Sequence, residues 1–211
     1  MDPMSGPWSR SVPSFLGMWV AMMAVMMLPS LAPGLWRYRE AAANAGATRP
    51  ARLAALVGVA YFVVWNLFGL AVLPLGTAVE AVRMQLPGLA RAEPVVVGAV
   101  VVMAGAFQLT RWKAHHLACC REALRCGTLT PGVRIAVREG LRIGLHCCGS
   151  CFGFVAILLA FGIMDFRVMA VVTAAITAER LARSGERTAR ATGAMAMAVG
   201  LMLIVRAGGL A

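Results

Sequence analysis

The stretch FLGMWVAMMAVMMLPSLAPGL, residues 15–35, decides the class of fold. It contains no charged side chain and is long enough for a membrane helix, because crossing a bilayer takes roughly 20 apolar residues. A cleaved signal peptide is the alternative for an apolar run near an N-terminus. The segment PSLAP at 29–33 is a poor cleavage site and the run is long for a signal peptide, so we predict a retained transmembrane span.

Further apolar segments follow along the whole chain, which is 60% hydrophobic and so exceeds the roughly half-apolar composition of soluble domains. The last two segments are short, about 22 Å each at 1.5 Å per residue. They form either thin spans or the two halves of a re-entrant hairpin. We predict an all-α fold, a polytopic transmembrane helical bundle of about six spans, or else five or four, in a single domain over residues 1–211. The predicted spans are 15–35, 53–76, 94–110, 144–164, 168–182 and 192–207.

Basic residues are distributed unevenly between the connections. Of the 20 Lys and Arg residues, 15 lie in the connections between spans one and two, three and four, and five and six. The positive-inside rule places these connections in the cytoplasm and both termini outside, in a bacterial periplasm. The net charge of +11 is then a topology signal with contacts to anionic lipid, and no nucleic-acid partner is expected. We predict a multi-pass protein of the bacterial inner membrane, embedded in the lipid bilayer.

All six cysteines and all three histidines fall within residues 115–151. Thiolate and imidazole are the soft and borderline ligands of transition metals. The predicted topology places the whole group on the reducing, cytoplasmic side, where stable disulfides are not expected. The pattern therefore indicates a metal site or free-thiol chemistry. The residues concerned are His115, His116, Cys119, Cys120, Cys126, His146, Cys147, Cys148 and Cys151.

Helical spacing groups these residues into pairs, because positions four apart share a face of a helix. The pairs are His115 with Cys119, His116 with Cys120, and Cys147 with Cys151. If the third span continues as helix through residue 121, its pairs and that of span four supply a Cys₃His or Cys₂His₂ set, or a thiolate site of lower coordination for Cu(I). Cys147 is also predicted in the first turn of its helix, where the helix dipole favours a thiolate. Cys126 taken alone is more typical of an apolar filler.

Methionines line the first span. Met18, Met22 and Met26 form one stripe at helical spacing, and Met23 with Met27 forms another. Thioethers suit Cu(I), although methionine is also an adaptable packing residue. Because span one ends inside, its last methionines lie near the predicted depth of the cysteines.

Glu179, at the predicted cytoplasmic end of span five, is the carboxylate closest in depth to the cysteines. A carboxylate buried in a membrane is costly and often functional. At a helix end we expect Glu179 to pair with Arg180 or Arg183, or to lie at the membrane interface.

Three motifs resemble an uncharacterised bacterial family of predicted metal-binding integral membrane proteins, some of whose members are labelled copper chaperone. They are WVAMMAVMMLPS at 19–30, FQLTRWK at 107–113 followed by Leu117 and Cys120-Arg121, and GLHCCGSC at 144–151 continuing through Met169 to Glu179. In that family the last cluster usually reads Cys-x-Gly-Cys-Cys. This sequence has Ser150 in place of one of these cysteines and an additional Cys148, which is the alternative source of the missing thiol.

These observations together predict a metal-binding membrane protein that handles Cu(I), by delivery, sequestration or passage, without catalysis. Zn(II) is the alternative ion, and copper donor or acceptor proteins are the expected partners. The predicted ligands are Cys147, Cys151 and Cys120, then Cys148 and His116, with Met23 and Met27 as relay ligands.

Two other classes of protein remain open. A membrane thiol-disulfide oxidoreductase would cycle Cys119 with Cys120, or Cys147 with Cys148. It ranks lower because adjacent cysteines form strained disulfides and because we expect no CxxC motif. A non-catalytic assembly subunit of a membrane complex is the third reading. The sequence contains no P-loop, GxGxxG or GxSxG motif, so nothing in it indicates a nucleotide-driven machine or a serine hydrolase.

Overall fold

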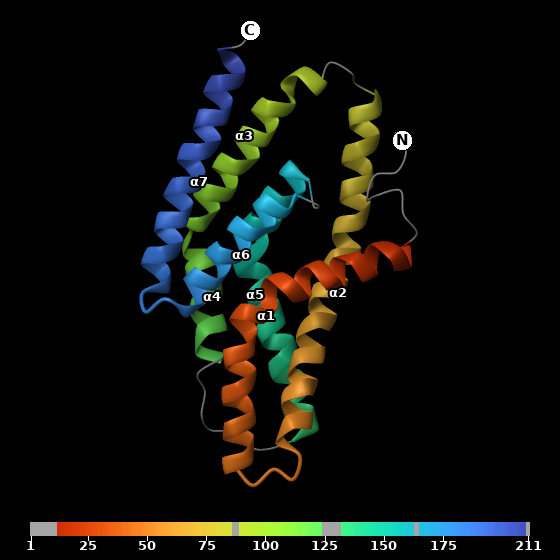
Figure 1. Cartoon of the computed structure of the whole chain (residues 1–211), viewed down its shortest axis with the longest axis vertical. Coiled ribbons are helices and arrows are strands. Elements are labelled where there is room, and N and C mark those ends of the chain that lie inside the picture. The colour runs from red at the N-terminus through yellow and green to blue at the C-terminus, as the bar shows by residue number, and fades with distance from the viewer. Residues whose placement is uncertain (1–11, 86–88, 124–131, 163–164, 210–211) are drawn as a thin grey trace.

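The computed structural model describes residues 12–85, 89–123, 132–162 and 165–209, and these residues form seven helices and no strand. Figure 1 shows the helices in an elongated bundle, with α2 running along most of its length. The fold is therefore all-α, as the sequence predicts. The helices are α1 (Val12–Asn44), α2 (Pro50–Gln85), α3 (Leu89–Gln108), α4 (Arg111–Ala123), α5 (Val133–Phe161), α6 (Phe166–Leu181) and α7 (Gly185–Gly208).

Four of these helices, α1, α2, α5 and α7, are long and apolar enough to cross a membrane. Helices α3 and α4 add a fifth crossing if they form one bent span, because they meet at an angle of 63°. Helix α6 has 16 residues, which is short for a full crossing. The described residues thus form a membrane helical bundle with four or five helices that meet the length criterion.

Several helices extend beyond the apolar segments seen in the sequence. Helix α5 begins at Val133, where the sequence predicts the span to start near residue 144. Cys147 consequently lies well inside α5, and the prediction that it occupies a first helical turn is wrong. The third span also does not continue straight through residue 121. The chain bends after Gln108, and the Thr110 hydroxyl accepts a hydrogen bond from the backbone N–H of Lys113 at 3.3 Å, which starts α4 as a separate helix.

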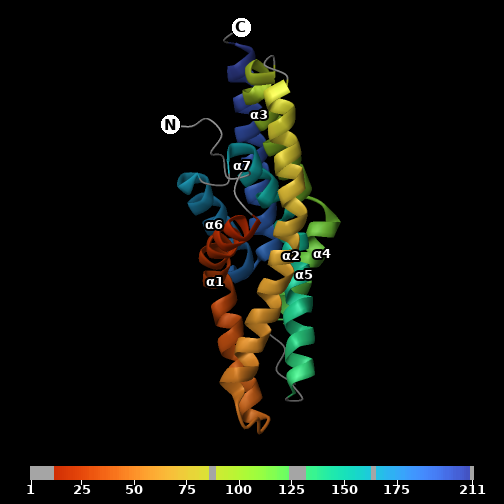
Figure 2. The same ribbon diagram turned by 90° about the vertical axis from the view of Figure 1, so that its right-hand side faces the viewer.

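The helices pack in two groups that meet at α5. Helix α2 packs against α1 and α5, whereas α3 packs chiefly against α7, and both views show α3 and α7 side by side (Figures 1 and 2). Glycines permit the close approach of α3 and α7. A Cβ atom on Gly105 would lie 2.7 Å from Gly193 O, and one on Gly200 would lie 2.7 Å from Gly98 O. Such small-residue contacts are typical of helix packing in membranes.

Helix α1 is bent, so that its first part crosses the bundle and its second part runs alongside α2 (Figure 1). Pro29 and Pro33 lie inside this helix, and each removes one backbone hydrogen bond, which accounts for the bend. Trp19 from the first part is buried and donates its indole N–H to Trp65 O of α2 at 2.9 Å. The bend thus brings both parts of α1 against one apolar core.

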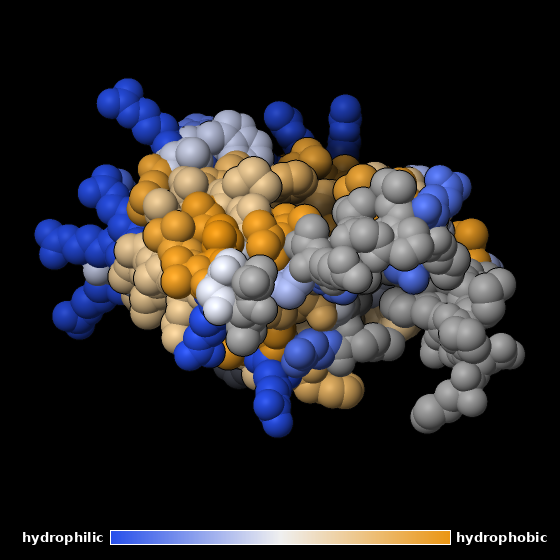
Figure 3. Space-filling model, turned by 90° about the horizontal axis from the view of Figure 1, so that it is seen from above, coloured by the Kyte–Doolittle hydropathy of each residue, from blue (hydrophilic) through white to orange (hydrophobic). Residues whose placement is uncertain are grey.

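The outer surface carries many exposed apolar side chains. Figure 3, seen from the top of Figure 1, shows apolar surface between hydrophilic side chains that project at the margins. Val59, Leu67, Val171 and Val205 are each at least 60% exposed. A helical surface of this kind matches the hydrocarbon of a bilayer better than water.

Candidate functional site

Two cysteines form a buried pair on one face of α5. Cys147 and Cys151 are 0% and 2% exposed, and their Sγ atoms lie 4.0 Å apart. Their spacing of one helical turn is the one that the sequence predicts. Twice a metal–sulfur bond of about 2.3 Å is about 4.6 Å, so one soft ion can contact both sulfur atoms with little movement. We call these two residues the thiol pair.

Ser150 precedes Cys151 on α5 and lies close to its thiol. Its hydroxyl donates a hydrogen bond to Cys147 O at 3.0 Å and lies 3.8 Å from Cys151 Sγ. This local bond keeps Ser150 buried within α5.

A buried arginine from α6 contacts the thiol pair. One terminal nitrogen of Arg180 is hydrogen-bonded to Cys147 Sγ and lies 3.8 Å from Cys151 Sγ, and the other donates to Ser30 Oγ of α1 at 3.0 Å. A guanidinium remains charged in proteins. Sequence reasoning assigned Arg180 to the loop charges and missed this role. The available signal was its position directly after Glu179 at the end of an apolar helix.

Two further helices contribute polar groups to this region. Tyr61 of α2 is buried, and its hydroxyl is hydrogen-bonded to Cys147 Sγ at 2.9 Å. Cys120 of α4 is 0% exposed and lies within electrostatic range of Arg180 and Cys151. Side chains of four other helices, α1, α2, α4 and α6, therefore lie around the thiol pair of α5, which explains how it is excluded from solvent.

Glu179 has a different partner from the one predicted. Its carboxylate forms an ion pair with Lys113 of α4 at 2.8 Å and accepts a hydrogen bond from the Thr192 hydroxyl of α7 at 2.7 Å. Both side chains of the ion pair are almost fully buried, at 1% and 3% exposure. The prediction of a pairing with Arg180 or Arg183 is therefore wrong, because α4 packs over this end of α6 and supplies the lysine.

The histidines form a second group where α4 and α5 pack together. His116 Nδ1 lies 3.1 Å from His146 Nδ1, and His115 Nε2 lies 3.6 Å from Cys119 Sγ. His115 is exposed and the other three are half-buried. The predicted contact of His115 with Cys119 is thus confirmed. We call these four residues the histidine cluster.

His116 and Cys120 are not brought together despite their helical spacing. Cys120 points into the core, whereas His116 packs against Trp112, with ring centroids 4.2 Å apart, and faces His146. Cys148 is half-buried and packs against the apolar core. Cys126 lies outside the described residues, and the five described cysteines are free thiols.

The methionines of α1 lie in the same apolar core as the thiol pair. Met23, Met26 and Met27 are each 1% exposed, and Met18 is partly buried. This burial fits both predictions made for them, packing and soft-metal ligation.

Within the described ranges, no group of three or more His, Cys, Asp or Glu side chains is arranged to hold a metal ion. A four-ligand Cys₃His or Cys₂His₂ set is therefore not assembled there. The arrangement present at the centre of the bundle is a pair of thiols with a fixed positive charge beside it.

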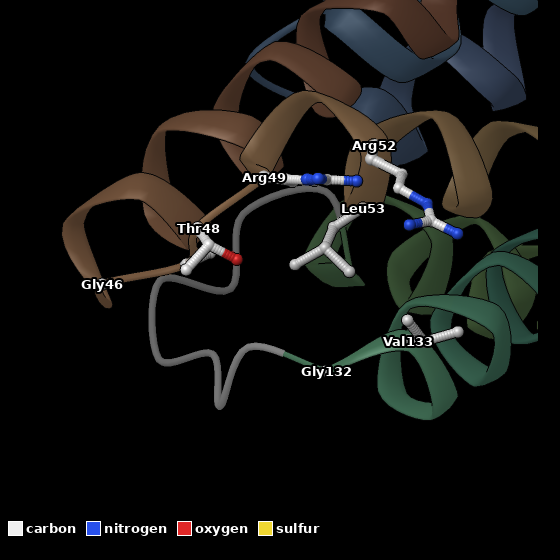
Figure 4. Close-up of a pocket in the computed structure, with 8 residues that line it drawn as sticks. Gly46, Thr48, Arg49, Arg52, Leu53, Gly132 and Val133 are labelled. Atoms are coloured by element: carbon white, nitrogen blue, oxygen red, sulfur yellow. The ribbon is translucent and has the colours of Figure 1, made fainter.

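A pocket near the basic end of the bundle does not contain these ligands. It lies between the α1–α2 turn and the start of α5 and is bordered by Arg49 and Arg52 (Figure 4). Among the residues that the structure describes, its lining includes Thr48, Leu53 and Val133 but no sulfur or imidazole.

Comparison with known proteins identifies one family. The family model described as "PpoB2: Copper chaperone" matches residues 16–203, which include the thiol pair, the histidine cluster, Arg180 and the methionines of α1. No curated protein and no solved structure matches the chain.

Proposed function

The chain belongs to the PpoB2 copper chaperone family, and on that premise we propose that it binds Cu(I) at the thiol pair within the membrane bundle. The observation that carries the proposal is the separation of 4.0 Å between Cys147 Sγ and Cys151 Sγ in a buried site. Thiolate ligands favour Cu(I) among biological metals, and a soft monovalent ion needs few of them. Zn(II) is the alternative ion, but its sites normally have four ligands.

Further ligands join the pair in this proposal. Cys120 is the third choice, because it is buried in the same core and lies within electrostatic range of Cys151. Cys148 and His116 follow, since each is half-buried on the same two helices. These residues would contact the ion during its arrival or departure, when α4 and α5 shift relative to each other.

The methionines offer a route to the thiol pair. Met23 and Met27 are proposed as relay ligands, because both are buried in the core that contains the cysteines. Their thioethers bind Cu(I) weakly enough to release it to thiolates. The first span would in this way connect the outer side of the membrane with the site.

The proposed setting is the inner membrane of a bacterium. The whole chain forms one transmembrane domain with six crossings, in which α6 counts as a short span. The Arg-rich connections then lie in the cytoplasm and both termini in the periplasm. The protein delivers, stores or passes copper without catalysis, in exchange with donor and acceptor proteins.

Copper content tests this proposal directly. The full-length protein would be purified in detergent under reducing, anaerobic conditions, loaded with Cu(I) and analysed by mass spectrometry for metal. We expect close to one copper per chain in the parent and almost none in a Cys147→Ser/Cys151→Ser variant. Cys119→Ser is the matched control, because it removes a half-buried thiol outside the pair. A double variant that keeps its copper, or a parent that binds none, contradicts the proposal.

One observation favours a second function. The segment Cys148-Gly149-Ser150-Cys151 has CxxC spacing within the continuous helix α5, which is the spacing of many thiol-disulfide oxidoreductases. The prediction that ranked this function lower rested in part on the absence of a CxxC motif, and that part is wrong. Thiol titration before and after mild oxidation separates the two functions. A redox protein loses two thiols reversibly without metal, whereas a copper site loses thiol reactivity only when the ion is bound.

A further inference from the structure

Arg180 places a permanent positive charge beside the thiol pair. Its two terminal nitrogens contact Cys147 Sγ and Ser30 Oγ, and its side chain is only 5% exposed. A guanidinium is not deprotonated in proteins. Any ion that binds the two thiols therefore binds next to this fixed charge.

The groups that face Arg180 do not cancel its charge. Helices α1 and α2 face it with the hydroxyl groups of Ser30 and Tyr61, and α4 places the buried thiol of Cys120 near it, which is uncharged while it keeps its proton. The neighbouring carboxylate of Glu179 is already paired with Lys113. In the part of the chain that the structure describes, no carboxylate forms an ion pair with Arg180. The negative charge that balances Arg180 must then come from the thiol pair and what it binds.

Charge balance separates monovalent from divalent ions at this site. An ion that displaces both thiol protons to solvent is held by two thiolates. With a monovalent ion the complex keeps one negative charge, which Arg180 neutralises. With a divalent ion the complex is neutral, and the guanidinium charge is left uncompensated inside the bundle. A buried charge without a partner is strongly unfavourable.

We propose that Arg180 is a specificity-determining residue, which makes the thiol pair selective for a soft monovalent ion over Zn(II). The inference rests on the proposed function, because it concerns the same two ligands. The number of ligands also favours a monovalent ion over Zn(II). Among the described residues, no third ligand completes a metal-binding group with the thiol pair. A substitution can remove the charge of Arg180 without changing either thiol, so the effect of the charge can be tested separately from that of the ligand number.

Competition between Ag(I) and Zn(II) tests the proposal. Ag(I) serves as a monovalent soft probe that does not change its oxidation state under these conditions. The full-length protein in detergent would be equilibrated with both ions at buffered free concentrations, and the bound metals measured by mass spectrometry. We expect Arg180→Met, which removes the charge and keeps an apolar chain, to shift the bound Ag(I)/Zn(II) ratio toward zinc by at least about tenfold, or about 1.4 kcal/mol.

Three further variants complete the experiment. Arg180→Lys keeps the charge, and we expect its ratio to stay near that of the parent. Arg180→Gln is a second neutral variant, which keeps a donor for Ser30 and decides the question if the methionine variant does not fold. Arg183→Met removes an exposed basic side chain close to the same helix end and should leave the ratio unchanged.

The outcomes separate this proposal from the proposed function. If the neutral variants keep the parent's ratio, or if the lysine variant shifts as far as they do, Arg180 does not set the selectivity. If the parent binds neither Ag(I) nor Cu(I), or if binding survives Cys147→Ser/Cys151→Ser, the copper function itself fails. Because the ratio is measured within one sample, a lower yield of folded protein does not change it.

Discussion

The thiol pair and the histidine cluster meet on α5, where His146 directly precedes Cys147, yet they differ in burial and in charge. The thiol pair is buried between α5 and four other helices and contacts the guanidinium of Arg180. The histidine cluster is open to the surroundings, and its closest internal contact joins two imidazole rings, at 3.1 Å. Ligand type alone does not distinguish these regions. Burial and the neighbouring fixed charge distinguish them. Both properties favour a stable copper site at the thiol pair and transient contacts at the histidine cluster.

The largest effect is expected from the ion pair that holds α4 over the thiol pair. Lys113→Ala or Glu179→Ala leaves an unpaired buried charge, which typically costs about 3–5 kcal/mol of stability. Thermal unfolding in detergent measures this loss. Glu186→Ala is the matched control, because its pair with Arg190 is exposed and should contribute little. Equal losses in the buried and the exposed pair would show that Lys113 and Glu179 are not enclosed as described.

Thiol accessibility provides the next largest contrast. We expect a maleimide to label Cys119 and Cys148, which are half-buried, about a hundredfold faster than Cys147 and Cys151, a ratio that corresponds to about 2.7 kcal/mol of local opening. The readout is mass spectrometry of peptides after timed labelling of the metal-free protein. Labelling in denaturing detergent serves as the control and should abolish the difference. Similar rates in the folded protein would contradict the enclosure of the thiol pair.

The hydrogen bond between Tyr61 and Cys147 provides a third test of the comparison. Tyr61→Phe removes the hydroxyl 2.9 Å from Cys147 Sγ while keeping the ring in place. We expect Cu(I) affinity to fall by about threefold to tenfold, because one hydrogen bond contributes about 0.5–1.5 kcal/mol. Competition with a Cu(I) chelator measures the change. Tyr38→Phe alters the other tyrosine of the chain and should have no effect.

The smallest effect is expected at the histidine cluster. Replacing His115, His116 and His146 together by alanine should change Cu(I) affinity by about twofold at most, as is usual for half-exposed sites away from a binding centre. The same chelator competition applies, with the Cys147→Ser/Cys151→Ser variant as the reference for complete loss. If the triple variant loses copper as fully as that reference, the ion is held by the imidazoles and the comparison must be reversed.

Contacts within one helix were predictable from the sequence. The approach of Cys147 to Cys151, and that of His115 to Cys119, follows from a spacing of four residues. The same rule failed for His116 and Cys120, because the direction in which each side chain points depends on what α4 packs against. The start of α5 was also misplaced, since its polar first turns continue the helix beyond the apolar segment.

By itself, the sequence determined that the chain is helical and membrane-embedded, and that its soft ligands fall within one segment. These properties depend on local composition and on the helical period. Only the tertiary structure decided that Arg180 meets Cys147, 33 residues away, and that Lys113 meets Glu179. Such partners lie on different helices, so the packing of the helices, rather than any local spacing, sets which charges meet which thiols in the core.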